Sequence, residues 1–186
     1  MTITSKTRRN PEQRATALLA DLAVDTSKKI DVEAIARELG ADVRRVALAD
    51  GLSGLLVRDG GRKIISYSDA DIEPRQRFTI AHEIGHLLMH PGRPHIAETT
   101  KLVNVSKREV SRNYADAREE REANQFAAAL LMPGAAIIDR WDLLASKVDN
   151  ADSLAGQLAR EYGVSKSAMK YRANNLGLYQ FVEDSE

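Results

Sequence analysis

The sequence contains no cysteine. This absence excludes disulfides, thiolate metal ligands and a cysteine nucleophile, so a bound zinc ion would take only nitrogen and oxygen ligands. Long apolar runs are also missing: no segment could cross a bilayer, and no apolar stretch follows the basic residues at the N-terminus. We therefore expect a cytoplasmic protein.

Neither sign of charge is in excess, because 27 lysines and arginines balance 27 aspartates and glutamates. No global field draws the chain to nucleic acid or to an anionic membrane, so any such binding must be local. The 186 residues are 43% hydrophobic, 29% charged and only 5% aromatic. This length and composition predict a helix-rich globular protein with a buried core.

The spacing of apolar residues predicts a mainly helical α+β protein. Helices are expected over 11–24, between Asp31 and Gly40, and over 71–89, 116–132, 135–147, 151–162 and 166–175. Strands are expected over 43–48, 54–57 and 63–67, with a hairpin turn at 58–62. The polar segment 92–115 has no clear period, and we expect it to run over the surface beside a cleft.

The predicted helix 71–89 contains the motif His82-Glu83-x-x-His86. Helical geometry places the two imidazoles about 40° apart on adjacent turns of one face, so both can reach a single ion. Glu83 is rotated by about 100° from His82 and points beside that ion, where a carboxylate can take a proton from water. The motif predicts a catalytic zinc site, although two partly buried histidines, or a metal without a reaction, would give the same pattern.

A third ligand is expected from an acidic residue on a second helix, because cysteine is absent and no histidine follows at the spacing of an extended histidine motif. Glu122 is the first choice, since it shares a face with Ala123 and Phe126 and its carboxylate would be buried without a cation. Glu119, one turn earlier on nearly the same face, is the alternative. Both glutamates could instead lie on a solvated helix edge.

Four further polar residues are candidates for other roles in such a site. His90 follows His86 by one turn, and its position at the helix end predicts a capping role or a role behind the ligands. His95, Tyr67 and Tyr114 are candidates for stabilising an oxyanion, but nothing in the sequence places them near the zinc.

Residues 154–175 have the outline of a helix, a glycine turn and a capped second helix, which is typical of a helix-turn-helix. Lys166, Lys170 and Arg172 could meet phosphates, but three cations near Glu161 make a modest patch. Helix packing or docking of a partner is therefore favoured over contact with DNA.

Three segments together resemble the ImmA/IrrE family of bacterial and phage metallopeptidases: FTIAHEIGHLLMHP at 78–91, EANQFAAALLMP at 122–133 and GVSKSAMKYRANNLGL at 163–178. The resemblance begins near residue 31 and implies a zincin-like domain with a gluzincin-like site. In that site His82, His86 and Glu122 would hold the metal, and Glu83 would be the catalytic acid and base. It also implies a substrate, a helix-turn-helix repressor of the XRE type whose cleavage relieves repression.

We therefore expect a zinc-dependent endopeptidase, with manganese as an alternative metal, that cleaves a partner repressor or antitoxin. The predicted organisation is a flexible tail over 1–10, a zincin-like domain over 11–148 with a small antiparallel-containing sheet packed on the motif helix, and a helical segment over 149–186 packed on the same unit. A second hypothesis is a non-proteolytic regulator that binds DNA or a repressor and has a structural or vestigial metal site. A third is the toxin of a toxin–antitoxin pair.

Overall fold

The computed structural model describes residues 10–49, 51–90, 117–148 and 150–178, and its fold is α+β, as the sequence predicts. The helices are α1 (Pro11–Asp21), α2 (Val32–Glu38), α3 (Glu73–Met89), α5 (Ala117–Leu131), α6 (Gly134–Ala145), α7 (Ala151–Tyr162) and α8 (Lys166–Asn175). The strands are β1 (Ala41–Val46), β2 (Gly54–Asp59) and β3 (Arg62–Ser68). None of the described helices is long and apolar enough to cross a membrane.

Local signals in the sequence set the ends of several helices. The side chains of Asn10, Asp31, Asn150 and Ser165 accept hydrogen bonds from backbone N–H groups in the first turns of α1, α2, α7 and α8. Helix α1 ends three residues before the predicted end at Val24, because Ala23 adopts a left-handed φ of 49° and turns the chain. Helix α7 ends at Gly163, whose φ of 65° is the left-handed conformation that glycine favours.

The three strands form one mixed sheet in the order β1-β3-β2. Strands β2 and β3 pair antiparallel, and Gly60 and Gly61, both with positive φ, make the two-residue turn between them. Strand β1 pairs with β3 in parallel, with Ala41 opposite Lys63. Strand β2 therefore lies at one edge of the sheet, with β3 as its neighbour among the described strands.

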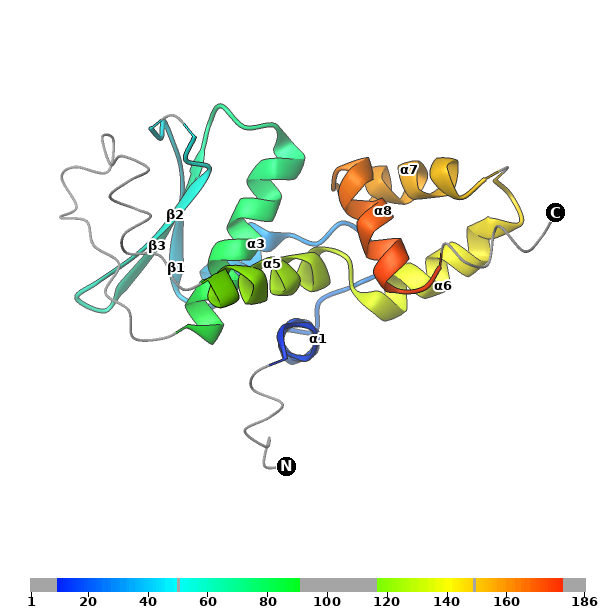
Figure 1. Cartoon of the computed structure of the whole chain (residues 1–186). Coiled ribbons are helices and arrows are strands. Elements are labelled where there is room, and N and C mark those ends of the chain that lie inside the picture. Colours follow the sequence, from blue (N-terminus) through cyan, green and yellow to red (C-terminus); the bar gives the residue numbers. More distant parts are fainter. Residues whose placement is uncertain (1–9, 50, 91–116, 149, 179–186) are drawn as a thin grey trace.

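Helix α3 lies between the sheet and α5, as Figure 1 shows. Its buried residues Ile80 and Ile84 belong to the same core as Leu56 and Ile65 of the sheet and Phe126 of α5. Helix α1 packs on α5, so the N-terminal helix closes this core from below in Figure 1. Helix α3 is therefore packed on two sides, against the sheet and against α5.

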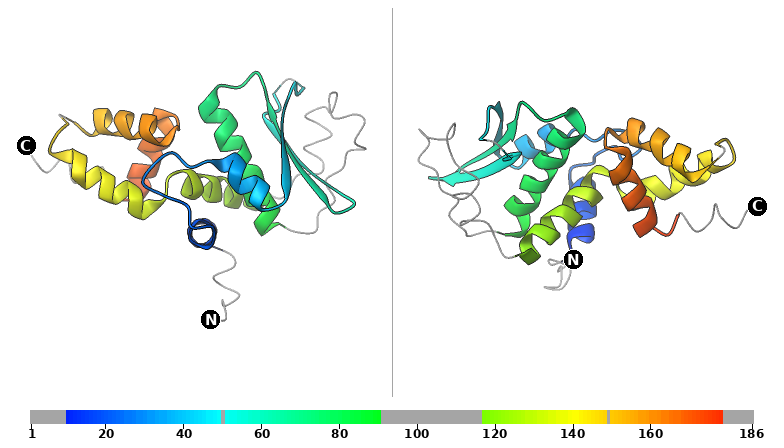
Figure 2. Two further views of the ribbon diagram at one scale, coloured as in Figure 1. Left: turned by 180° about the vertical axis from the view of Figure 1, so that it is seen from behind. Right: turned by 45° about the horizontal axis from the view of Figure 1, so that its top comes forward.

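The C-terminal helices α6, α7 and α8 extend the same hydrophobic core to the other side of the molecule (Figure 2). Arg172 of α8 is 6% exposed; its guanidinium donates to the Met132 carbonyl at 2.9 Å and pairs with Glu12 of α1. Lys166 and Lys170 both pair with Asp152 of α7. Of the three cations considered for DNA contact, Arg172 is therefore committed to packing, and the two lysines share one carboxylate.

Candidate metal centre

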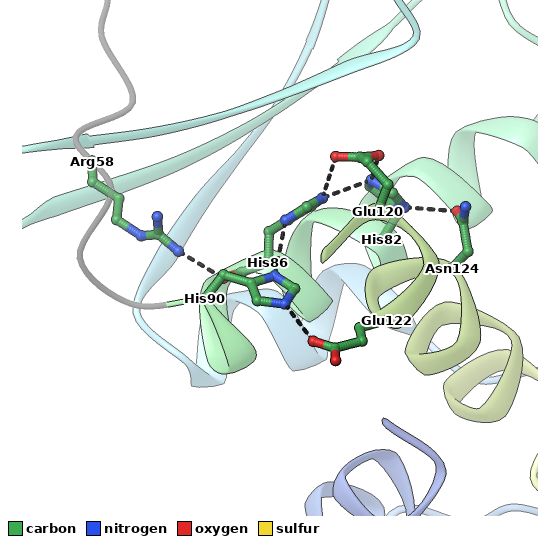
Figure 3. A network of polar contacts seen from close by, with 7 residues as sticks. All are labelled: Arg58, His82, His86, His90, Glu120, Glu122 and Asn124. Atoms are coloured by element: carbon green, nitrogen blue, oxygen red, sulfur yellow. Dashed lines mark hydrogen bonds and ion pairs between the residues drawn. The ribbon is translucent and has the colours of Figure 1, made fainter. Parts of the chain in front are cut away.

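Both histidines of the His-Glu-x-x-His motif lie on the α3 face that meets α5 (Figure 3). The side chain of His86 is 2% exposed and that of His82 is 15% exposed. The two rings meet edge to face, with their centroids 4.6 Å apart. Their Nε2 atoms point toward each other and are separated by only 3.0 Å.

Glu120 of α5 completes a group of three side chains with these histidines. Its Oε2 lies 3.4 Å from His82 Nε2, and its Oε1 lies 3.2 Å from His86 Nε2. Oε1 is buried, and beyond this contact with His86 no described residue offers it a hydrogen bond. His82, His86 and Glu120 are the one group of metal-ligating residues that the described part of the chain brings together in this way.

The spacing of these atoms fits a divalent ion. Zinc with bonds of about 2.0–2.1 Å in tetrahedral geometry separates its ligand atoms by about 3.3–3.4 Å, close to the 3.0, 3.2 and 3.4 Å found here. Two imidazole nitrogens and one carboxylate are also a ligand set that suits zinc. A cation would satisfy the buried carboxylate oxygen of Glu120, so these residues fit a metal.

Electrostatics within the group favour charge separation. Burial would raise the pKa of the Glu120 carboxyl, but its contacts with His82 and His86 outweigh burial and hold the pKa well below its usual value. Burial likewise opposes the charged form of His82, yet the contacts with Glu120 and Asn124 and the negative charge of Glu83 raise the pKa of its imidazole. The surroundings therefore stabilise positive charge between the two rings.

The other nitrogen of each ring also has a partner. Asn124 Oδ1 lies 2.9 Å from His82 Nδ1, and His90 Nδ1 lies 3.1 Å from His86 Nδ1. Asn124 follows Glu120 by one helical turn, so α5 supplies two contacts to the site from one stripe. Neither Glu120 nor Asn124 was predicted from the sequence, and their separation of four residues was the signal available to find them.

Gly85 explains how α5 comes so close to α3. A Cβ added to Gly85 would lie 3.2 Å from both Ala123 Cα and Phe126 Cδ1, tighter than ordinary van der Waals contact. The two helices therefore meet at a position without a side chain, between His82 and His86 in the sequence. This close approach brings the Glu120 carboxylate within reach of both rings.

Glu83 lies on a different side of α3, next to the edge strand. It is 3% exposed, and a Cβ added to Gly54 at the start of β2 would lie 3.3 Å from its Oε1. The same Cβ would lie 2.1 Å from the methyl group of Thr79, one turn before Glu83. The absence of a side chain at Gly54 thus leaves room for the Glu83 carboxylate between helix and strand.

The structure places Glu122 away from the two Nε2 atoms. Its Oε2 lies 3.1 Å from His90 Nε2, and its Oε1 accepts a hydrogen bond of 2.8 Å from Arg118. Burial periodicity indicates only which residues lie near the core face of α5, and Glu122 and Glu120 lie on opposite flanks of that face. Glu120 faces the histidine pair, Glu122 faces the end of α3, and Glu119 does not belong to the group of three.

Of the three candidates for oxyanion stabilisation, Tyr67 is the one that the structure describes. The hydroxyl group of Tyr67, on β3, donates to Glu33 of α2 at 3.1 Å. His95 and Tyr114 lie outside the described residues, as does the segment 92–115 that we expected to border a cleft.

Comparison with known proteins supports the resemblance seen in the sequence. A model of the Peptidase M78 family, described as the IrrE N-terminal-like domain, matches residues 36–174. Among solved structures, the chain resembles a Mycobacterium tuberculosis transcriptional regulator with a TM-score of 0.58 and 18% identity, over 87% of this chain and 45% of that one. This likeness shows the fold alone, and the chain spans less than half of the regulator's length. No curated protein matches the sequence significantly.

Proposed function

Because the chain belongs to the Peptidase M78 family of IrrE N-terminal-like domains, we propose that it is a metal-dependent endopeptidase. The observation that supports this most strongly is that His82, His86 and Glu120 each bring one ligand atom within 4.8 Å of the other two, on the helix that also carries the buried Glu83. In this proposal Glu120 is the third ligand, in place of the Glu122 that the sequence predicts. We take zinc as the metal, with manganese as the alternative, and the cytoplasm as the place of action.

His82, His86 and Glu120 would hold the ion. A divalent metal supplies Lewis acidity there, which polarises the scissile carbonyl and activates water near neutral pH. Because the described residues offer only two imidazoles and one carboxylate, such a site would keep room at the ion for solvent or substrate. Asn124 orients the ring of His82 through its contact with Nδ1, the nitrogen that does not face the ligand group.

Glu83 would be the general base and then the general acid. It follows His82 directly in the helix, so its carboxylate lies beside the metal-binding face rather than on it. From there it takes the proton of the attacking water and returns it to the amine of the departing peptide. Its burial against β2 keeps bulk water away from the carboxylate.

An extended segment of the substrate would lie along β2. Among the described strands, β2 pairs on one side only, with β3, and in this proposal its other edge would pair with the substrate backbone. Gly54 opens the space between this strand and Glu83. We propose as substrate a partner repressor or antitoxin of the XRE type.

The test is cleavage of a small XRE-type repressor encoded beside this chain, incubated with the zinc-loaded protein. Glu83→Gln should keep zinc but lose about 10²–10⁴-fold in cleavage rate, because the general base is removed without changing the ligands. Glu38→Gln, an exposed change at the end of α2, is the matched control and should cleave normally. Full cleavage by the Glu83→Gln protein would reject the proposed mechanism.

The non-proteolytic regulator remains the competing hypothesis, and the same material tests it. Retention of DNA at low salt, lost when Lys166 and Lys170 are replaced, would favour it. The pairing of both lysines with Asp152 and the burial of Arg172 favour the peptidase instead.

A further inference from the structure

A series of hydrogen-bonded side chains connects His86, the more buried of the two histidines, to the protein surface (Figure 3). His86 Nδ1 lies 3.1 Å from His90 Nδ1, His90 Nε2 lies 3.1 Å from Glu122 Oε2, and Arg118 Nε donates to Glu122 Oε1 at 2.8 Å. The exposed fractions of the side chains rise outward, from 2% for His86 through 9% for His90 and 21% for Glu122 to 62% for Arg118. The series thus connects the candidate metal ligand to an ion pair at the surface.

The direction of each hydrogen bond in this series follows from its two ends. A carboxylate only accepts, so His90 must donate to Glu122 through a protonated Nε2. A neutral His90 then has a bare Nδ1, which can only accept, and His86 must donate to it from Nδ1. A neutral His86 protonated at Nδ1 has its lone pair on Nε2, the atom that faces His82 and Glu120.

The other tautomer of His90 would have the opposite effect. With a proton on Nδ1, His90 would present an N–H to His86 and require a bare Nδ1 there. The proton of His86 would then move to Nε2 and occupy the position that a metal needs. Arg118 supports the productive arrangement, because its positive charge keeps Glu122 ionised and therefore an acceptor.

The backbone around His86 is held as well. Arg58, on β2, donates to the His86 carbonyl at 2.8 Å, and the His90 N–H donates to the same carbonyl at 3.2 Å. His90 is the C-cap of α3, one turn after His86, and its ring contacts the His86 ring directly. His86 is therefore held at two points, through its backbone carbonyl and through Nδ1 of its ring.

We infer that His90 and Glu122 are positioning residues that hold His86 in the tautomer able to bind the metal. This inference rests on the proposed function, since it presumes that His86 is a ligand. It gives Glu122 a role at the site through His90 instead of direct ligation. It also makes the two histidine ligands unequal: the amide of Asn124 contacts His82, whereas the carboxylate of Glu122 contacts His86 through a second imidazole.

The test uses the full chain and two pairs of variants, each of which compares a side chain that can accept a hydrogen bond with an apolar one. Asn at position 90 presents a carbonyl oxygen where Nδ1 stood and can still accept from His86, whereas Leu cannot. Gln at position 122 can still accept from His90, whereas Leu cannot. Zinc affinity is measured by competition with a chromophoric chelator, and the melting temperature of the zinc-free protein reports packing separately.

We expect His90→Leu and Glu122→Leu to weaken zinc binding by about 10–100-fold, and His90→Asn and Glu122→Gln to weaken it clearly less. A loss of packing alone would affect both members of a pair and would appear in the melting temperature. Equal zinc affinity within each pair would overturn the inference. A wild-type chain that binds no zinc would instead overturn the proposed metal site and the inference with it.

The tautomers can be read directly in the wild-type protein, which covers the case of a variant that fails to fold. In the zinc-loaded chain labelled with ¹⁵N-histidine, long-range nitrogen–proton correlations should show His90 protonated at Nε2 and bare at Nδ1. They should also show His86 protonated at Nδ1. Protonation of His90 at Nδ1 would overturn the inference even if zinc is bound tightly.

Discussion

Replacement of Gly54 by alanine tests whether helix and strand meet as closely beside Glu83 as the structure indicates. The added methyl would lie 2.1 Å from Thr79 Cγ2, which is less than any real contact, so Thr79 or the strand must move. Overpacking of this kind costs about 1–3 kcal/mol. The φ of Gly54 is not left-handed, so alanine also stabilises by about 0.4–1 kcal/mol through the unfolded chain.

The change Thr79→Ser separates these two contributions, because it can remove the γ-methyl group that collides. Thr79→Ser alone should cost about 0.8–1.5 kcal/mol for the lost buried methyl. When Thr79→Ser is already present, Gly54→Ala should cost much less, since the 2.1 Å contact is gone and the nearest remaining contacts of the new methyl are 3.3 Å to Glu83 and 3.4 Å to the Ser66 carbonyl. The coupling energy in the double-mutant cycle is therefore about 1–3 kcal/mol.

The assay is urea denaturation followed by circular dichroism, with all four proteins in excess chelator so that metal binding does not contribute to stability. Gly54→Ala should be net destabilising in the wild-type background and should lose most of that penalty in the Thr79→Ser background. Equal free-energy changes in the two backgrounds would refute the close contact between β2 and α3 and, with it, the placement of Glu83 against the edge strand.

Two further predictions concern the C-terminal helices. Arg172→Met should destabilise the zinc-free fold by about 1–3 kcal/mol in the same denaturation assay, because the Met132 carbonyl loses its buried donor; an unchanged midpoint would contradict this. Hydrogen bonds from Lys166 and Lys170 lower the pKa of the Asp152 carboxyl from 3.8 to about 2, so the stability they contribute is present above pH 3.8 and is lost as the pH falls toward 2. Replacing both lysines by alanine should return the Asp152 pKa toward 3.8 in a carbon-detected NMR titration, and a pKa that stays near 2 would contradict the pairing.

Local patterns in the sequence were sufficient to predict most elements of the fold. The ends of α7 and α8 match the predicted bounds, since Asn150 and Ser165 cap their starts and Gly163 ends α7. Pairing between distant segments was not predicted. The parallel contact of β1 with β3 joins strands separated by the whole of β2, and no local signal specifies such a neighbour.

Contacts between distant segments also decide which glutamate of α5 meets the histidine pair, and local patterns do not specify such contacts. Burial periodicity identified the core face around Phe126, and this face is as the pattern predicts. Both Glu120 and Glu122 border that face, one on each side, so periodicity alone could not decide which of them meets the histidine pair. The decision depends on where α3 crosses α5, and that crossing is set by the contact of Gly85 with Ala123.

The chain shares its fold with a longer transcriptional regulator, and this likeness concerns the fold and not the activity. The solved regulator shares the fold over 45% of its length, and 18% identity does not carry its role across. The arrangement of charged groups at α3 and α5 is therefore the stronger support for the proposed activity.

The central claim is that one divalent ion is held by His82, His86 and Glu120. A crystal structure of the zinc-loaded chain, with anomalous scattering measured on both sides of the zinc absorption edge, tests it most directly. We predict one anomalous peak within about 2.0–2.2 Å of His82 Nε2, His86 Nε2 and a Glu120 oxygen. A peak bonded to Glu122 in place of Glu120, or no peak between the two imidazoles, would contradict the account.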